Sequence, residues 1–324
     1  MAQDYNYPIE RPSMASEPSS WGGLWTEEKL EAFEKYVNAY LTIMNVSRKK
    51  YGWKLIYFDG FAGSGSRTEK TKEKDSALLL DFFKESSIME EELKLYKGAA
   101  ERVLSIPQRG FDYYYFVDKD PESSIKLHEL LSRFENENTL VYRNSDANRQ
   151  IEMLAGAMQK DKKFSSLVLL DPFGMQVDWG SIEKLKGTRT DLWILIPTGV
   201  IVNRLLDRKG ELTHIEKLKS FFGKDEDFLR EYFYNKRTVD TLFGETEIIE
   251  KVKEPIQKIA ELYIEQLHSI FKHVTPKPLV LRNSRNTPIF HFACASNNLT
   301  AVNIANEIIN KKQNNENNQN RMDR

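Results

Sequence analysis

The sequence predicts an α/β fold: a doubly wound, mostly parallel sheet with a terminal antiparallel hairpin and a helical insertion. Three observations support this fold class. Short, continuously apolar segments alternate with helical segments, which is typical of parallel sheets covered by helices on both faces. Several apolar segments end in an aspartate or a glycine-rich turn, where such sheets bind their ligands. The last two strand-like segments are joined by a short polar connection of hairpin type.

One long helix and five strands make up the first part of the predicted core. Residues 25–44 carry apolar side chains at helical spacing, so we expect a helix before the first strand. This order favours strand–helix–strand units that build a parallel sheet. The predicted strands are 54–58, 113–117, 140–143, 166–170 and 192–196, and the predicted helices between them are 76–84, 90–104, 123–134, 149–158 and 181–185.

The remaining segments flank or complete this core. Residues 1–20 are polar and predict a disordered lead, and residues 21–199 form the Rossmann-like core with its N-terminal helix. Residues 200–273 are rich in charged and aromatic side chains and predict a helical insertion. Residues 274–310 complete the core, and the low-complexity segment 311–324 predicts a disordered tail. Within 274–310 the predicted elements are strands 278–282 and 289–293 and a helix at 300–310.

Composition limits the classes of protein to which the chain can belong. The 324 residues are 40% hydrophobic and 29% charged, with a net charge of −1, which suits a globular protein that is not basic throughout. A single cysteine, Cys294, excludes an intrachain disulfide framework and a cysteine-clustered metal site, and the histidines do not fall at metal-binding spacing. No apolar run approaches the roughly 20 residues of a membrane span. We therefore expect a cytoplasmic protein with no metal and no membrane anchor.

Local basic clusters are candidates for phosphate contact despite the near-neutral net charge. They are residues 48–50, the loop 67–74, and Arg282 with Arg285. The alternative is that these are solvated loop charges, since acidic residues interleave some of them.

A glycine-rich turn follows the first predicted strand. Asp59 ends the apolar run, and the turn continues through Phe61, Gly63 and Gly65. Glycine accepts positive φ and lets a ligand approach the backbone, and Asp59 can accept from an ammonium group. Thr68 stands where a dinucleotide fingerprint has its third glycine, which argues against NAD or FAD. The alternative interpretation is a tight connection without a ligand.

Two further strand ends carry carboxylates. Asp118 ends the second strand and can accept from both hydroxyls of a ribose. Asp120 is its nearby competitor, although Asp120-Pro121 also predicts a helix N-cap. Asp146 follows the third strand and could accept from an exocyclic adenine amine, with a helix cap as the equally weighted alternative. Asn148 is an adjacent candidate.

The fourth strand ends in Asp171-Pro172-Phe173-Gly174. Asp171 could accept from a substrate amine and orient the lone pair of that amine toward a methyl group. Phe173 could stack on a planar substrate, whereas the alternative is a structural Asp-Pro turn. Because the carboxyl ends of parallel strands meet at one edge of a sheet, we expect the four carboxylates to line a single site.

These motifs resemble those of two groups of proteins. Asp-x-Phe-x-Gly-x-Gly at 59–65 together with Asp-Pro-Phe-Gly at 171–174 looks like the motifs of S-adenosylmethionine-dependent amino-methyltransferases. The closer resemblance is to the three-Cys-motif partner protein family and covers roughly residues 21–310. The features that carry it are Trp25 with Lys29-Leu30, Tyr57 to Gly65, Phe116 to Asp120, Leu170 to Met175, and Phe292 to Asn297.

The resemblance implies a class I methyltransferase-like fold, S-adenosylmethionine as cofactor, and a partner protein with a three-cysteine motif encoded nearby. This sequence departs from the amino-methyltransferase tetrapeptide, since Phe173 replaces the second proline and Gly174 the stacking aromatic residue. Nucleobase stacking, and with it the substrate class, is therefore open. The residues to which the resemblance gives roles are Asp59, Gly63 and Gly65 for the methionine part, Asp118 for the ribose, Asp146 for the adenine, and Asp171 and Phe173 for the target amine, with Phe61 as a further cofactor-binding residue.

The leading hypothesis is a cytoplasmic S-adenosylmethionine-dependent methyltransferase that acts on an amine, with nucleic acid as the expected substrate class. Transfer would be direct and in line, without a covalent intermediate. The alternative is a non-catalytic partner or regulatory protein of a multi-protein mobile-element or defence system, with residues 200–273 and the charged loops as its interface. A third hypothesis is a nuclease or other defence enzyme that uses Asp171.

Overall fold

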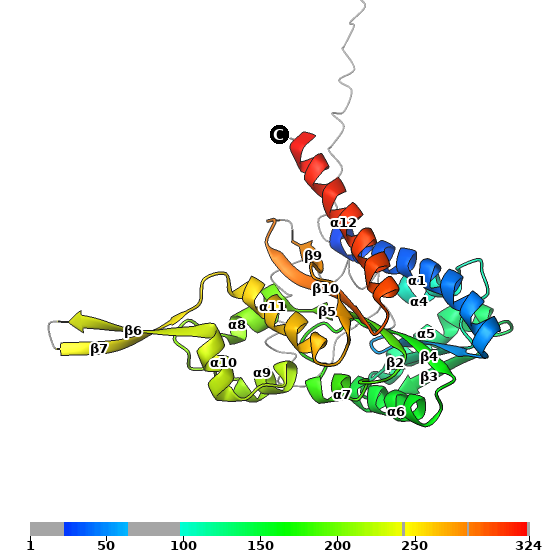
Figure 1. The fold of residues 1–324 in the computed structure, drawn as a ribbon, viewed down its shortest axis with the longest axis horizontal. Helices are drawn as coiled ribbons and strands as arrows, with labels where there is room; N and C mark the ends of the chain where they lie inside the picture. Colours follow the sequence, from blue (N-terminus) through cyan, green and yellow to red (C-terminus); the bar gives the residue numbers. More distant parts are fainter. Residues whose placement is uncertain (1–22, 64–97, 242–243, 284, 323–324) are drawn as a thin grey trace, which may run out of the picture.

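An eight-stranded sheet between two layers of helices forms the body of the protein, and a two-stranded hairpin projects from it (Figure 1). The computed structural model describes residues 23–63, 98–241, 244–283 and 285–322. The elements up to the fifth strand are α1 (Gly23–Tyr51), β1 (Lys54–Asp59), α4 (Gly98–Leu104), β2 (Tyr113–Asp118), α5 (Pro121–Leu131), β3 (Leu140–Asn144), α6 (Ala147–Lys160), β4 (Phe164–Leu170), α7 (Trp179–Glu183) and β5 (Thr190–Ile196). Those that follow are the π-helix η2 (Thr198–Val202), α8 (Asn203–Leu205), α9 (Ile215–Phe222), α10 (Glu226–Phe233), β6 (Tyr234–Thr241), β7 (Gly244–Lys251), α11 (Pro255–His268), β8 (His273–Val274), β9 (Leu279–Arg282), β10 (Pro288–Ser296) and α12 (Leu299–Met322). A one-turn 3₁₀ helix, Ser132–Phe134, follows α5.

The central sheet is mostly parallel, with the strand order β3-β2-β1-β4-β5-β10. The first five strands are parallel to one another, whereas β10 is antiparallel to β5 and pairs on its other side with β8 and β9. Asp59 at the end of β1 is in register with Phe116 of β2 and Leu169 of β4, so these three strands end at one edge. His291 lies opposite Ile196, which brings the start of β10 to the same edge. The predicted α/β, Rossmann-like class is therefore confirmed.

Two apolar cores lie on opposite faces of this sheet. On one face Tyr57 and Trp193 belong to a cluster with residues of α1, α4, α5 and α12. On the other face Phe58 and Ile194 belong to a cluster with residues of α6, α7 and α9 to α11. The strands are apolar on both faces because both are covered by helices, which explains the continuous apolar runs of the sequence.

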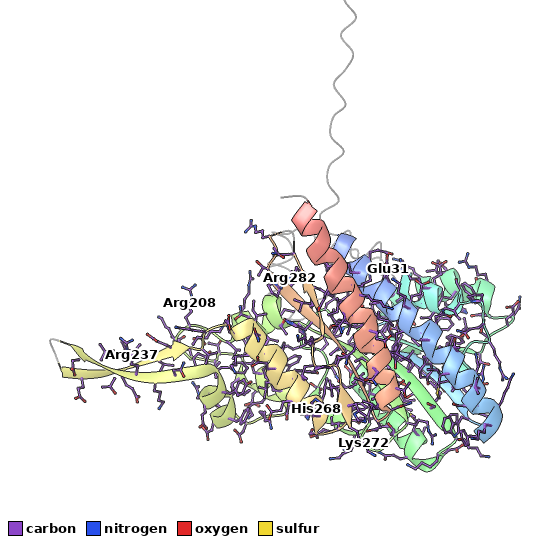
Figure 2. The ribbon with its side chains drawn as sticks, turned by 45° about the horizontal axis from the view of Figure 1, so that its top comes forward. Glu31, Arg208, Arg237, His268, Lys272 and Arg282 are labelled. Carbon is purple, nitrogen blue, oxygen red and sulfur yellow. The ribbon has the colours of Figure 1, made fainter. Side chains whose placement is uncertain are left out.

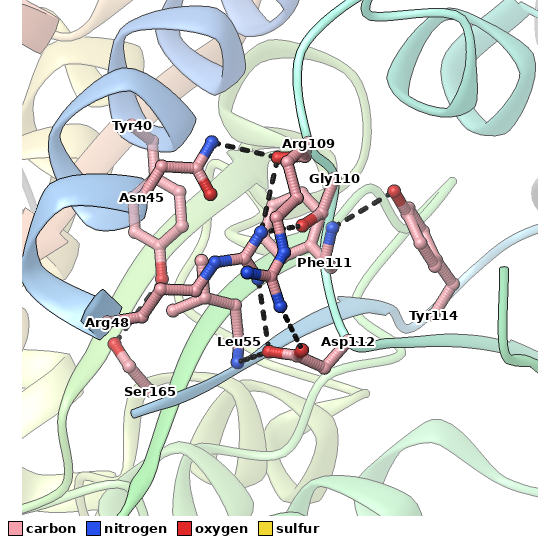
Figure 3. Close-up of polar contacts among 10 residues, drawn as sticks. All are labelled: Tyr40, Asn45, Arg48, Leu55, Arg109, Gly110, Phe111, Asp112, Tyr114 and Ser165. Carbon is pink, nitrogen blue, oxygen red and sulfur yellow. Dashed lines mark hydrogen bonds and ion pairs between the residues drawn. The ribbon is translucent and has the colours of Figure 1, made fainter. Parts of the chain in front are cut away.

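The C-terminal end of α1 is fixed to the amino edge of the sheet by a buried arginine (Figure 3). Arg48 donates to Asp112 at 3.2 Å and to the carbonyl oxygen of Gly110 at 2.8 Å. Asp112 also accepts from the backbone nitrogen of Leu55 at 2.7 Å, so one ion pair joins α1, β1 and the loop before β2. Arg48 is 5% exposed and is not available to a phosphate, contrary to the phosphate contact considered for residues 48–50.

The insertion at 200–273 is not only helical. Besides α8 to α11 it contains the hairpin of β6 and β7, which extends away from the body in the direction of the labelled Arg237 (Figure 2). Polar residues such as Glu247 lie along both strands, and the sequence from 234 to 251 contains no Asn-Gly pair of the kind that marks hairpin turns. The hairpin therefore lacks the sequence signals from which strands are predicted.

Helix α12 continues through most of the segment predicted to be a disordered tail. Lys312 forms an ion pair of 2.7 Å with Glu31 of α1, and Gln313 donates to the carbonyl oxygen of Pro278 at 3.2 Å. Extending an existing helix costs far less than nucleating one, so residues with little preference for order of their own can continue α12.

The five predicted parallel strands are confirmed in order and, to within two residues, in position. The N-terminal helix is longer than predicted and ends at Tyr51 rather than at Met44. The predicted lead 1–20, the loop 67–74, the helix 76–84 and the first part of the helix 90–104 lie outside the described residues. Within the described ranges, no helix is long and apolar enough to cross a membrane.

Candidate functional site

The ends of adjacent strands bring four predicted carboxylates to one edge of the sheet. Asp59 and Asp118 are the last residues of β1 and β2, whereas Asp146 and Asp171 follow β3 and β4. The strand order β3-β2-β1-β4 makes this edge continuous from Asp146 to Asp171. The edge corresponds to the place where open α/β sheets bind their ligands.

Asp59 is a buried carboxyl group at the centre of this edge. It is 1% exposed and accepts from the backbone nitrogen of Phe61 at 3.2 Å and from the hydroxyl of Tyr57 at 3.3 Å. Burial raises the pKa of Asp59 to about 7, with further increases from the charges of Asp171 and Asp118. Among the described residues it has no basic partner within ion-pair distance. The geometry leaves this carboxyl able to hold a cation.

Asp118 ties the glycine turn to the end of β2. Its Oδ2 accepts from the backbone nitrogen of Gly63 at 2.8 Å, and its Oδ1 accepts from that of Asp120 at 2.8 Å. Gly63 has a φ of +54°, which glycine adopts without strain. The predicted Gly65 lies outside the described residues.

Asp120 and Asp146 both cap helices. Asp120 accepts from the backbone nitrogen of Ser123 at 3.1 Å, with Pro121 in the first helical position of α5, as its sequence predicts. Asp146 accepts from the backbone nitrogens of Asn148 at 2.9 Å and Arg149 at 3.4 Å. Its carboxylate is exposed and keeps free lone pairs, so the cap does not remove it from the site.

Asn148 serves the packing of α6 against the loop before α7. Its amide nitrogen donates to the carbonyl oxygen of Gln176 at 2.9 Å, and its oxygen accepts from the backbone nitrogen of Asp178 at 2.8 Å and the hydroxyl of Ser181 at 2.9 Å. Asn148 therefore has a structural role in this packing rather than a role in ligand binding.

Asp171 is paired with a buried lysine that sequence reasoning did not assign to the site. Lys29 Nζ lies 2.9 Å from Oδ1 and 2.7 Å from Oδ2 of Asp171, and both side chains are 2% exposed. Lys29 comes from α1, which runs antiparallel to the strands and so brings its N-terminal turns to the carboxyl edge. The position of Lys29 in the sequence could have indicated that it is buried, because it lies four residues from both Trp25 and Phe33, on the apolar face of the helix.

The first turns of α1 cover this part of the edge. Trp25 stacks on Phe290 of β10 with ring centroids 5.2 Å apart, and Lys29 Nζ lies 5.3 Å from the centroid of the Trp25 ring. Trp25 Nε1 and Thr26 Oγ1 are buried and have no hydrogen-bond partner in the part of the chain that the structure describes. Buried polar atoms of this kind are uncommon and mark places where a polar ligand or water can bind.

The two predicted aromatic residues are partly exposed. Phe61 packs against the core beneath α6 and α7, and the backbone nitrogen of Phe173 donates to Oε1 of Gln176 at 3.0 Å. Both side chains retain an accessible surface next to the carboxylates that precede them in the chain.

A histidine and a threonine continue the edge beyond β5. The hydroxyl of Thr198 and Nδ1 of His291 are 2.7 Å apart, and both residues are buried. Burial lowers the pKa of His291 to about 4, with a smaller contribution from the charge of Arg282, a residue of β9 labelled in Figure 2. His291 lies in β10, which confirms the prediction that it is a strand residue, and Arg282 brings a cation to this end of the edge.

A groove of about 560 Å³ lies elsewhere on the surface, between α1 and α4. Acidic and basic side chains line it together, among them Glu31, Glu34, Lys35 and Arg102. None of the candidate site residues takes part in it, so we do not connect this groove with the carboxyl edge. No group of three or more metal-ligating side chains occurs in the described ranges.

Comparisons with known proteins add no functional assignment. No family model matches the chain, and no curated protein matches it. Among solved structures it is similar to protein LPL1258 from Legionella pneumophila str. Philadelphia 1, described under the family model DUF519, with a TM-score of 0.37 and 14% identity over 85% of this chain and 97% of that chain.

Proposed function

We propose that the carboxyl edge binds S-adenosylmethionine and that the protein transfers its methyl group to an amine, in nucleic acid as the leading substrate class. The observation that supports this most strongly is the convergence of Asp59, Asp118 and Asp171 around the turn at Gly63. These groups meet the needs of a nucleoside that carries an amino acid and a positive charge.

The order of the strands also supports the proposal. The sheet continues past β5 into an antiparallel β10, and β8 and β9 lie beyond it. An antiparallel strand beyond the fifth parallel strand is the feature by which the class I methyltransferase fold differs from a plain dinucleotide-binding fold.

The chain's own residues fit the parts of this cofactor. Asp59 is a buried carboxyl without a basic partner among the described residues, and the ammonium of the methionine part would supply that partner. Gly63 has the positive φ that glycine adopts without strain, and Asp118, which accepts from the backbone nitrogen of Gly63, would accept from the ribose hydroxyls. Asp146 is exposed beside them and would accept from the adenine amine.

Asp171 and Phe173 would position the target amine. The bound cofactor supplies an electrophilic methyl group, so the protein needs to orient the amine rather than to form a covalent bond with it. Asp171 would accept an amine hydrogen and direct the lone pair, and the partly exposed Phe173 would contact a planar group. Arg282, an exposed cation at the same edge, would contact a phosphate of that substrate.

Calorimetric titration with S-adenosylmethionine and with its demethylated product tests the proposal. We expect both to bind the wild-type protein and binding to be lost in Asp118→Ala. The matched control is Asp227→Ala, which removes an exposed carboxylate of α10 and should leave binding unchanged. Absence of binding of both compounds to the wild-type protein would refute the proposal.

A second candidate function is that of a non-catalytic partner protein. Two observations favour it: Asp171 is already paired with Lys29, and the hairpin of β6 and β7 projects from the body with Ile248 and Ile249 exposed. A partner with a three-cysteine motif, as the family resemblance implies, would be its first candidate ligand. A stable complex with such a protein, formed by a chain that binds no cofactor, would favour this function over methyl transfer.

A further inference from the structure

The Lys29–Asp171 pair places a positive charge inside the carboxyl edge. One ammonium nitrogen bonds both oxygens of the carboxylate, at 2.9 and 2.7 Å, and solvent reaches neither side chain to more than 2%. These oxygens are the acceptors that the proposed function assigns to the target amine.

Core packing alone does not account for this arrangement. Burying two charges costs several kcal/mol in desolvation, and replacing such a pair by apolar residues is often neutral or stabilising. The same end of α1 also buries Trp25 Nε1 and Thr26 Oγ1 without partners among the described residues. The polar groups of Lys29, Trp25 and Thr26, all from α1, are therefore buried in a region that apolar side chains would fill at a lower cost in desolvation free energy.

The pair also lies close to the proposed position of the cofactor. The charge of Asp171 is one of the causes that raise the pKa of Asp59, the carboxyl to which the cofactor ammonium is assigned. The Lys29 amine is thus held by Asp171 within electrostatic reach of the site where the methyl donor would bind.

We propose that Lys29 is the resident occupant of the target-amine subsite: its ammonium neutralises Asp171 in front of the methyl donor until a target amine replaces it on one or both oxygens. This inference rests on the proposed function and deepens it by naming what the subsite accepts. A group that replaces Lys29 must donate N–H hydrogen bonds to a carboxylate, which favours an amine over a carboxylate or a phosphate. Lys29 acts through Asp171 and is a positioning residue.

The test compares the affinities of S-adenosylmethionine, which carries a sulfonium charge, and of its neutral demethylated product. A unit charge about 6 Å away in an effective dielectric of about 20 changes an affinity by about a hundredfold. At pH 8.5, Lys29→Met should leave Asp171 unpaired beside the sulfonium and raise the preference for the charged cofactor about ten- to hundredfold. Asp171→Asn should lower that preference, because it leaves the Lys29 cation without its counter-ion.

The ion pair of the buried Arg48 with the partly exposed Asp112 gives the matched control. Arg48→Met removes a buried cation at the opposite edge of the sheet and should leave the preference unchanged. An unchanged preference in both Lys29→Met and Asp171→Asn, with cofactor still bound, would overturn this inference and leave the proposed function standing. If Lys29→Met does not fold, the direction of the change in Asp171→Asn decides. A wild-type protein that binds neither compound contradicts the proposed function, and this inference with it.

Discussion

Replacing Asp59 by asparagine should stabilise the protein at neutral and alkaline pH. The carboxyl is buried beside Asp171 and Asp118, so ionising it in the folded state is unfavourable. Asparagine has nearly the same shape and keeps an oxygen that can accept from the backbone nitrogen of Phe61. The substitution therefore removes a charge while leaving the local packing in place.

The size of the effect follows from the pKa. The pKa of Asp59 is about 7 in the folded protein against a reference value of 3.8. A difference of about 3 units corresponds to about 4 kcal/mol, at about 1.4 kcal/mol per unit. Because the folded-state pKa is raised, the stabilising contribution of the protonated carboxyl is complete below pH 3.8 and is lost as the pH rises to about 7.

Urea unfolding between pH 4 and pH 8.5 measures this effect. The free energy of unfolding of Asp59→Asn, minus that of the wild-type protein, should rise by about 3 to 4 kcal/mol across this range and level off above pH 8. Asp227→Asn, an exposed carboxyl in α10, should show no comparable rise. A difference between Asp59→Asn and the wild-type protein that does not change with pH would show that Asp59 ionises freely and would refute the reasoning.

Three further predictions concern the site and its surroundings. Lys29→Met alone should lower the free energy of unfolding by about 3 to 5 kcal/mol, because it leaves a buried carboxylate unpaired. The double substitution Lys29→Met with Asp171→Leu should recover most of this loss. Equal losses of unfolding free energy in the single and the double variant, measured by urea unfolding, would contradict the buried pair. Gly199→Ala should cost about 1 to 3 kcal/mol, since a Cβ there would overlap the carbonyl oxygen of Pro288, and a melting temperature equal to that of the wild-type protein would argue against this packing of η2 on β10. Replacing residues 236–249 by a two-residue Asn-Gly turn should leave the cofactor affinity within about twofold of the wild-type value. The hairpin is remote from the carboxyl edge, and affinity at the edge depends on local contacts. Loss of cofactor binding would show that the hairpin belongs to the site.

The parallel part of the fold could be predicted because its strands are short and apolar on both faces. Leu167 to Leu170 and Leu192 to Ile196 are buried throughout, and nothing in such segments competes with the strand assignment. Strand ends could also be predicted, since Asp59 and Asp118 follow directly on apolar runs. These positions predict the candidate site from the sequence alone.

Two of the features that the sequence did not predict depend on contacts between distant segments, and the third is a hairpin without a strand pattern. Lys29 and Asp171 are 142 residues apart, and the sequence holds no signal that joins them. The hairpin of β6 and β7 has polar residues on both faces, so the alternation that identifies a strand is missing. The residues after Lys311 form a low-complexity sequence, but they continue α12, and Lys312 forms an ion pair with Glu31 of α1. For Lys29 and for α12, contacts between distant segments overrode the local pattern, whereas β6 and β7 are neighbours in the chain that pair with each other.

The most direct test of the central claim is a crystal structure of the protein grown with millimolar S-adenosylhomocysteine, the demethylated product. We predict density for the nucleoside at the carboxyl edge, with the ribose hydroxyls on Asp118 and the amino group of the methionine part on Asp59. An empty carboxyl edge at that concentration, or a nucleoside bound elsewhere on the protein, would contradict the claim.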